Sequence, residues 1–119
     1  MDPSPEIRAP VTGPTPETTM WYAMIAEDDP ARSELRPRWR PDHRRRLDAL
    51  RAEGRLRLAA PWGETDTVVH DPESATRGSL VVAAFPDLEE ARRWWTADPY
   101  VVQGLYARWK VLPLHLLTP

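Results

Sequence analysis

His43 is the side chain in this sequence of 119 residues that is best suited to move a proton. An imidazole titrates near neutrality, so it can both accept and return a proton at physiological pH. His43, Leu47 and Leu50 are spaced i, i+4 and i+7, which places the histidine on the apolar face of a helix. A histidine in that place can also be a buried structural residue that hydrogen-bonds a backbone group. The spacing therefore predicts an inward-facing His43 and leaves a catalytic and a structural role open.

Ser79 and Tyr100 carry hydroxyl groups that can hydrogen-bond a substrate oxygen on which negative charge develops. Ser79 is not expected to be a nucleophile, because no Gly-x-Ser-x-Gly turn surrounds it. Asp98 precedes Pro99, which is the pattern of a residue that caps a short helix beginning with proline. From spacing alone Asp98 is thus a capping residue, and each hydroxyl is as readily structural as functional.

The densest cluster of charge in the chain lies on both sides of His43. It consists of Arg36, Arg38, Arg40, Arg44, Arg45 and Arg46, with Trp39 among them. Such a run is usually a solvated face, but Arg40 and its neighbours can also attract a carboxylate or phosphate substrate toward His43. Arginine beside an aromatic ring can bind nucleic acid as well. The overall balance of 16 Lys and Arg against 18 Asp and Glu makes nucleic acid the weaker alternative.

The composition excludes several kinds of site. The chain has no cysteine, which rules out disulfides, a thiolate nucleophile and the usual structural zinc sites. His70 and His115 have no ligand partner at metal-binding spacing, so we expect neither a metal nor a cofactor. No apolar run approaches the roughly 18 residues of a membrane span, and the N-terminus does not resemble a signal peptide. We therefore expect a cytoplasmic protein.

The pattern of apolar residues divides the chain into a tail and one domain. Residues 1–19 are rich in proline and poor in large apolar side chains, which predicts a disordered tail before a domain over residues 20–119. Within the domain we expect a strand over 20–26, a helix that Pro41 opens and Gly54 ends, a strand from Arg55 to Pro61, a polar loop to Gly78, a strand over 80–85, a helix from Leu88 to Pro99, a short helical turn to Gly104, and a strand over 106–112. This order predicts the α+β class, with a ferredoxin-like βαββαβ antiparallel sheet and its helices on one face.

The strands over 20–26 and 80–85 are apolar at consecutive positions, so both of their faces are expected to be buried. Helices cover only one face of the predicted sheet. A domain of about 100 residues buries a modest fraction of its surface and gains stability from a partner. We therefore expect a homodimer in which the open sheet faces of two copies pack together.

Five segments give the sequence a family resemblance. They are Met-Trp-Tyr-Ala-Met-Ile-Ala-Glu-Asp from residue 20, Arg40-Pro41-Asp42-His43, Glu53-Gly54-Arg55-Leu56, Gly78-Ser79 and Ala97-Asp98-Pro99-Tyr100-Val101. Together they resemble the YciI-like family over nearly all of residues 20–116. The resemblance implies a dimeric α+β-barrel fold and an active site in which His43 and Asp98 form a dyad, with Ser79 and Tyr100 nearby. The loop over 61–77 departs from the family pattern, in which a Gly-Pro start and more glycines are common.

Two functions follow as hypotheses. In the first, the protein is a cofactor-independent isomerase, dehydratase or other lyase acting on a small anionic organic substrate. His43 is then the general base, Asp98 orients it, Tyr100 and Ser79 hold the developing oxyanion, and Arg40 with the other arginines steers the substrate. In the second, the same pocket belongs to a non-catalytic ligand-binding or accessory domain. The wider superfamily implied by the resemblance includes isomerases and lyases of aromatic breakdown.

Overall fold

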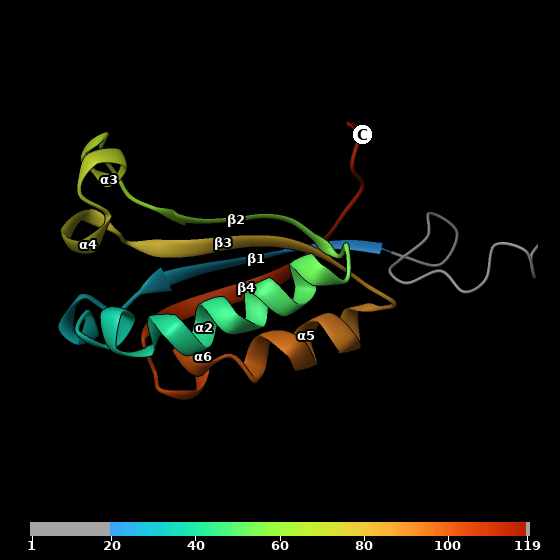
Figure 1. Ribbon diagram of the computed structural model, residues 1–119, viewed down its shortest axis with the longest axis horizontal. Coiled ribbons are helices and arrows are strands. Elements are labelled where there is room, and N and C mark those ends of the chain that lie inside the picture. The colour runs from blue at the N-terminus through green and yellow to red at the C-terminus, as the bar shows by residue number, and fades with distance from the viewer. Residues whose placement is uncertain (1–19, 119) are drawn as a thin grey trace, which may run out of the picture.

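The computed structural model describes residues 20–118, and its arrangement is shown in Figure 1. The predicted disordered tail, residues 1–19, lies outside the described residues. In chain order the elements are β1 (Met20–Asp28), a 3₁₀ turn η1 (Pro30–Arg32), α2 (Leu35–Ala52), β2 (Leu56–Trp62), α3 (Thr67–His70), α4 (Pro72–Ala75), β3 (Gly78–Phe85), α5 (Leu88–Thr96), α6 (Pro99–Val102) and β4 (Tyr106–Leu114).

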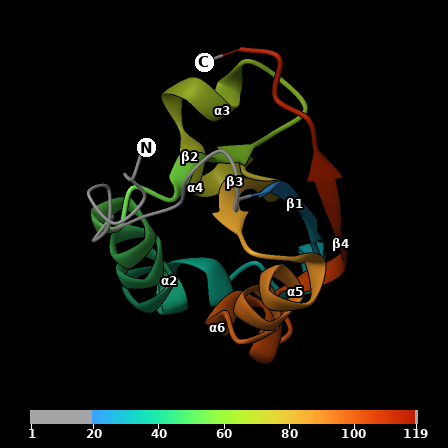
Figure 2. The same cartoon turned by 90° about the vertical axis from the view of Figure 1, so that its right-hand side faces the viewer.

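The strands form one antiparallel sheet in the order β2-β3-β1-β4. The two most apolar strands, β1 and β3, are therefore central, and β2 and β4 are the edges. Figure 2 shows α2, α5 and α6 gathered on one side of this sheet. The βαββαβ order and the one-sided helix layer confirm the predicted α+β, ferredoxin-like class.

The core fills the space between the sheet and the helices. Alternate residues of β1, Tyr22 and Met24, point into it, and Leu50 of α2 and Trp95 of α5 meet them from the other side. Trp95 has no exposed surface and stacks on the ring of Tyr106, with ring centroids 5.4 Å apart. The helices that carry the candidate site are thus fixed by apolar contacts with the same strands.

The helix that carries His43 begins earlier than predicted. α2 starts at Leu35, and Pro41 lies inside it instead of opening it. A proline inside a helix costs about 3 kcal/mol, because it removes one backbone hydrogen bond and crowds the preceding turn. Packing of Leu35 and Trp39 against the core, together with a buried ion pair made by Arg36, outweighs this local cost.

The segment between the second and third strands also differs from the prediction. β2 continues through Pro61 to Trp62, which is possible because β2 is an edge strand and one side of its backbone needs no partner. The predicted polar loop to Gly78 contains the short helices α3 and α4. β1, β3 and β4 each extend two residues beyond the predicted strands. Within residues 20–118, no helix is both long and apolar enough to cross a membrane.

Gly78 lies at a crowded point where β3 begins between β1 and β2. A Cβ atom added there would overlap the carbonyl oxygen of Ala26 and the ring of Trp62. Trp62 is held in that place by its own Nε1–H, which donates to the Ala26 carbonyl oxygen at 3.1 Å. Only glycine therefore fits at this position.

We expect Gly78→Ala to lower the free energy of unfolding by about 1–3 kcal/mol, because backbone or indole must move to admit the methyl group. Chemical denaturation followed by tryptophan fluorescence measures the loss. Gly54→Ala is the matched control: φ is 73° but no atom lies within 4 Å of an added Cβ, so only backbone strain of about 1 kcal/mol is expected. A Gly78→Ala variant as stable as the wild type would contradict the close approach.

Candidate active site

His43 and Asp98 lie in direct contact, although they are far apart in the sequence. His43 is on α2 and is 7% exposed, and Asp98 precedes α6 and is fully buried. His43 Nδ1 is 3.0 Å from Oδ1 and 2.9 Å from Oδ2 of Asp98. With Asp98 ionised, this geometry assigns the ring proton to Nδ1, which donates to the carboxylate and leaves Nε2 as the acceptor nitrogen.

Asp98 is a helix cap as well as the partner of His43. Its Oδ1 accepts a hydrogen bond from the backbone N–H of Tyr100 at 2.9 Å. Arg46 of α2 adds a third donor, with Nη1 3.1 Å from Oδ2. The capping role that spacing predicts and the pairing that the resemblance implies therefore coexist in one carboxylate.

Tyr100 supports the histidine with its ring. The two rings are stacked, with centroids 4.2 Å apart and planes inclined by 22°. The Tyr100 hydroxyl donates to the backbone carbonyl of Arg36 at 3.1 Å. Burial raises the pKa of Tyr100, although the charges of Arg36 and Arg40 oppose this, so the phenol stays neutral. The hydroxyl proton of Tyr100 is therefore already engaged in a hydrogen bond within the protein.

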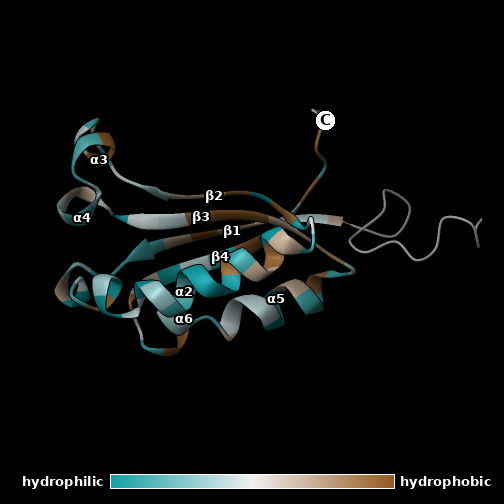
Figure 3. Cartoon of the chain, viewed as in Figure 1, coloured by the Kyte–Doolittle hydropathy of each residue, from teal (hydrophilic) through white to brown (hydrophobic). Residues whose placement is uncertain are grey.

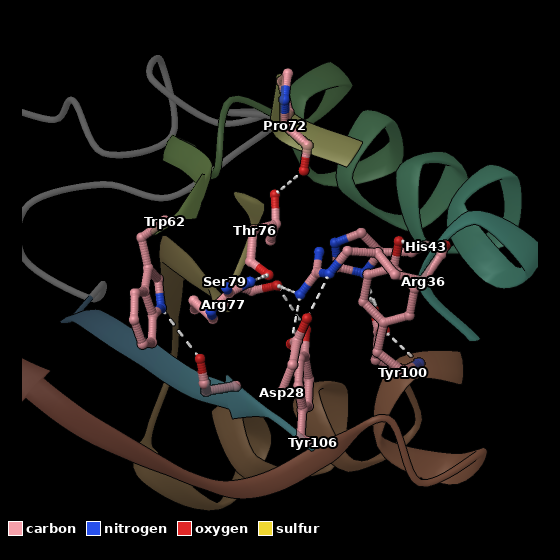
Figure 4. A network of polar contacts seen from close by, with 12 residues as sticks. Asp28, Arg36, His43, Trp62, Pro72, Thr76, Arg77, Ser79, Tyr100 and Tyr106 are labelled. Carbon is pink, nitrogen blue, oxygen red and sulfur yellow. Dashed lines mark hydrogen bonds and ion pairs between the residues drawn. The ribbon is translucent and has the colours of Figure 1, made fainter. Parts of the chain in front are cut away.

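A second buried polar cluster lies beside His43, as Figure 4 shows. Arg36 donates from Nε and Nη2 to the two carboxylate oxygens of Asp28, at 2.8 and 2.7 Å, and both residues are 8% exposed. Burial alone would lower the pKa of Arg36, but its hydrogen bond with Asp28 and the charge of that carboxylate raise it. Arg36 is thus a permanent buried cation.

Ser79 joins this cluster to the cleft. Its Oγ accepts from Arg36 Nη2 at 2.9 Å and from the hydroxyl of Tyr106 at 2.8 Å. Burial raises the pKa of Tyr106 far above its ordinary value, despite the opposing hydrogen bond with Ser79, so Tyr106 is a neutral donor. Two accepted hydrogen bonds occupy both lone pairs of the serine oxygen, and its own proton is left to donate elsewhere.

These side chains border a cleft of about 390 Å³ between α2, α4 and the facing ends of β2 and β3. Among the residues that line it are His43, Arg36, Arg40, Ser79, Tyr100 and Glu73. The guanidinium of Arg40 contacts the carboxylate of Glu73 on α4 at 2.6 Å, across the cleft. The structure thus brings four of the five sequence-predicted site residues to one cleft, with Asp98 directly behind His43.

Sequence reasoning did not single out several members of this site. Asp28 ends the first apolar strand. A carboxylate at the end of an apolar strand is a signal that could have identified it as a candidate site residue. Arg36 and Arg46 were visible only as part of an arginine cluster, and Tyr106 only as a strand residue. Among residues 20–118, no group of three or more His, Cys, Asp or Glu side chains is placed to hold a metal ion.

The raised pKa of Tyr106 gives a prediction at high pH. An unfolded tyrosine ionises near pH 10, whereas Tyr106 in the folded protein ionises well above that. Its contribution to stability is therefore complete below about pH 10 and is lost as the pH rises further. We expect the free energy of unfolding, measured by denaturant at about pH 8 and pH 11, to fall less in Tyr106→Phe than in the wild type. Equal losses in the two proteins would show that Tyr106 ionises normally.

Comparison with known proteins finds close sequence relatives. A profile of the YCII-related domain matches residues 20–115. The chain is 42% identical over 95 residues to "Protein YciI" of Escherichia coli, which covers 79% of this chain and 95% of that protein. It is 40% identical over 88 residues to an uncharacterised protein of Haemophilus influenzae, covering 74% of this chain and 89% of the relative.

A solved structure shares the fold at lower identity. It is 5-chloro-2-hydroxyhydroquinone dehydrochlorinase of Burkholderia phenoliruptrix, in complex with 2,5-dihydroxybenzoquinone. The TM-score is 0.68 at 20% identity, and the match covers 81% of this chain and 94% of the other. The profile match spans most of the chain, and the E. coli and H. influenzae relatives are 42% and 40% identical to it. This chain therefore belongs to the YCII-related, or YciI-like, family.

Proposed function

We propose that the protein is a cofactor-independent enzyme that moves a proton on a small anionic organic substrate, as an isomerase or a lyase. The observation that carries this proposal is the contact between His43 Nδ1 and the buried Asp98 carboxylate at the wall of the cleft. That contact leaves Nε2 with no hydrogen-bond partner among residues 20–118. A histidine held in one tautomer by a carboxylate is the arrangement of a general base.

In the proposed mechanism, His43 Nε2 takes a proton from a substrate carbon next to a carbonyl or ring hydroxyl group. Asp98 stabilises the imidazolium that forms. The electron pair of the broken C–H bond shifts toward the neighbouring substrate oxygen, which accepts hydrogen bonds from Arg36 and Ser79. His43 then returns the proton to another carbon in an isomerisation, or the electron pair expels a leaving group in a lyase reaction.

Charge at the cleft favours an anionic substrate. Arg40 lies on α2 one turn before His43, and its present partner, the carboxylate of Glu73, is 61% exposed. A solvated ion pair of this kind is worth at most about 1 kcal/mol, so a substrate carboxylate or phosphate can replace Glu73. Arg40 is accordingly proposed as a substrate-binding residue. For Tyr100 we propose a contact through its ring, because its hydroxyl already donates to the backbone carbonyl of Arg36.

The solved dehydrochlorinase supports the lyase alternative as an analogy of fold. Removal of hydrogen chloride is an elimination, in which a proton and a leaving group depart. This fold can therefore accommodate an elimination on a small hydroxylated ring. Because fold alone does not determine function, the proposal for this chain depends on its own His43 and Asp98. The mechanism needs no cofactor, and a chain without cysteine suits the reducing cytoplasm in which we place it.

A substrate screen followed by isotope exchange tests the reaction. Small carboxylic acids and hydroxylated quinones are first ranked by thermal shift of the wild-type protein. For a compound that binds, we expect a carbon-bound proton to exchange with D₂O, as followed by NMR. His43→Ala should slow this exchange by about 10²–10⁴-fold, and Asp98→Asn should slow it as well.

Arg45→Ala is the matched control, because Arg45 is on the same helix but is 72% exposed and pairs with Asp42. It should exchange at the wild-type rate. If both dyad variants also keep the wild-type rate, the mechanism is wrong. A compound that binds in the cleft and neither exchanges nor reacts would favour the ligand-binding or accessory domain instead.

We also propose that two copies pack through their open sheet faces. Because Tyr22 and Met24 point toward the helices, Ala23 faces the other side. Strand pairing places Leu58, Val82, Ala23 and Leu112 in one apolar row across that side. Figure 3 shows much of β3 in the hydrophobic colour. The proposed partner is a second copy of the chain, whose own apolar row would cover this one.

Light scattering after size exclusion tests the dimer. We expect a mass of twice 13.6 kDa for the wild type. Leu58 and Leu112 are 42% and 38% exposed, so aspartate at both positions should give a folded monomer. Val102→Asp is the control, because Val102 is the last residue of α6, which lies on the helix side of the sheet (Figure 2), and is 62% exposed. A wild-type monomer at micromolar concentration would overturn the proposed interface.

A further inference from the structure

The Asp98 carboxylate serves two side chains of α2 at once. Oδ2 lies 2.9 Å from His43 Nδ1 and 3.1 Å from Arg46 Nη1. Arg46 is itself held firmly, because its Nη2 donates to the Trp94 carbonyl at 2.7 Å and its guanidinium lies 4.3 Å from the centroid of the Trp94 ring. The guanidinium is therefore a fixed charge next to the dyad and not a mobile surface group.

A carboxylate alone beside His43 would favour the protonated imidazolium, because opposite charges attract strongly in a buried place. A protonated histidine cannot accept another proton. Arg46 opposes this in two ways, since it neutralises part of the Asp98 charge and repels a second cation on the same oxygen. With Arg46 present, Asp98 can fix the orientation of the His43 ring without also favouring its protonated form.

We propose that Arg46 is a positioning residue that shares the Asp98 carboxylate with His43 and keeps the imidazole neutral and ready to accept a proton. This inference rests on the proposed role of His43 as a base. It adds a third, cationic member to the pair, and that member acts only through Asp98. Arg46 does not line the cleft, so contact with the substrate is not part of its role.

Other charges face His43 and must be held constant in a test. On α2 the cleft is lined by Arg36, Arg40, Arg44, Asp48 and Arg51, and on α4 by Glu73. Arg36 and Arg40 are paired with Asp28 and Glu73, and Arg51 is paired with Asp48. From α6 and its cap, Tyr100 and Asp98 contact the ring. Arg46 differs from the other cations in reaching the carboxylate that holds His43.

The test is an NMR titration of the His43 ring in the full chain, which needs no substrate. In Arg46→Met the apolar stem still packs on Trp94, but the charge is absent. We expect the titration midpoint of His43 to move to higher pH by about half a unit or more, and the Nδ1–H tautomer to persist. Arg46→Lys keeps the charge and should stay near the wild type. Arg46→Gln repeats the neutral change in case the methionine variant does not fold.

Arg45→Met is the matched control, since it removes a neighbouring charge that pairs with exposed Asp42. It should leave the His43 titration in place. A midpoint that is unchanged in Arg46→Met, or that moves equally in Arg45→Met, overturns the inference and leaves Arg46 as a link between α2 and α5. A moved midpoint together with full turnover in His43→Ala would uphold Arg46 and reject the proposed function instead.

Discussion

The carboxylate of Asp98 has no exposure to solvent, so the helical layer around it must supply its hydrogen-bond donors. An isolated buried carboxylate costs several kcal/mol, so it must find donors inside the protein. It finds them in His43, in Arg46 and in the backbone N–H of Tyr100. Because the first two come from α2 and the third from α6, the carboxylate ties two helices together. The same contacts that make its burial tolerable also orient the histidine.

A second buried ion pair makes this arrangement rigid. Asp28 ends β1 and holds Arg36 near the start of α2, while Asp98 holds His43 and Arg46 two turns further along. A helix fixed at two points on one face cannot rotate about its axis, so the direction of the imidazole is set by the sheet and by α6 together. Both ion pairs sit in the layer between helices and sheet, where removal of either partner leaves an uncompensated charge.

The sequence predicts the fold well because its signals are local and periodic. The apolar runs of β1 and β3 and the break at Pro99 each specify an element within a few residues. The start of α2 was wrong because contacts of Leu35 and Arg36 with distant residues override the local cost of Pro41. For the site, helical spacing placed His43 inward, but pairing with Asp98 spans 55 positions and came from family resemblance. No local pattern indicates which of the six clustered arginines contacts Asp98.

Gly78 has a consequence for how the chain reaches its native pairing. On β3, Ser79 faces the helices and the buried arginine, whereas Leu80 faces the opposite side of the sheet. A slip of one residue would exchange these faces. It would also bring a residue with a side chain to the place where the Ala26 carbonyl and the Trp62 ring leave room only for glycine. Gly78 therefore allows β1, β2 and β3 to pair closely only in the register that places Ser79 at the cleft.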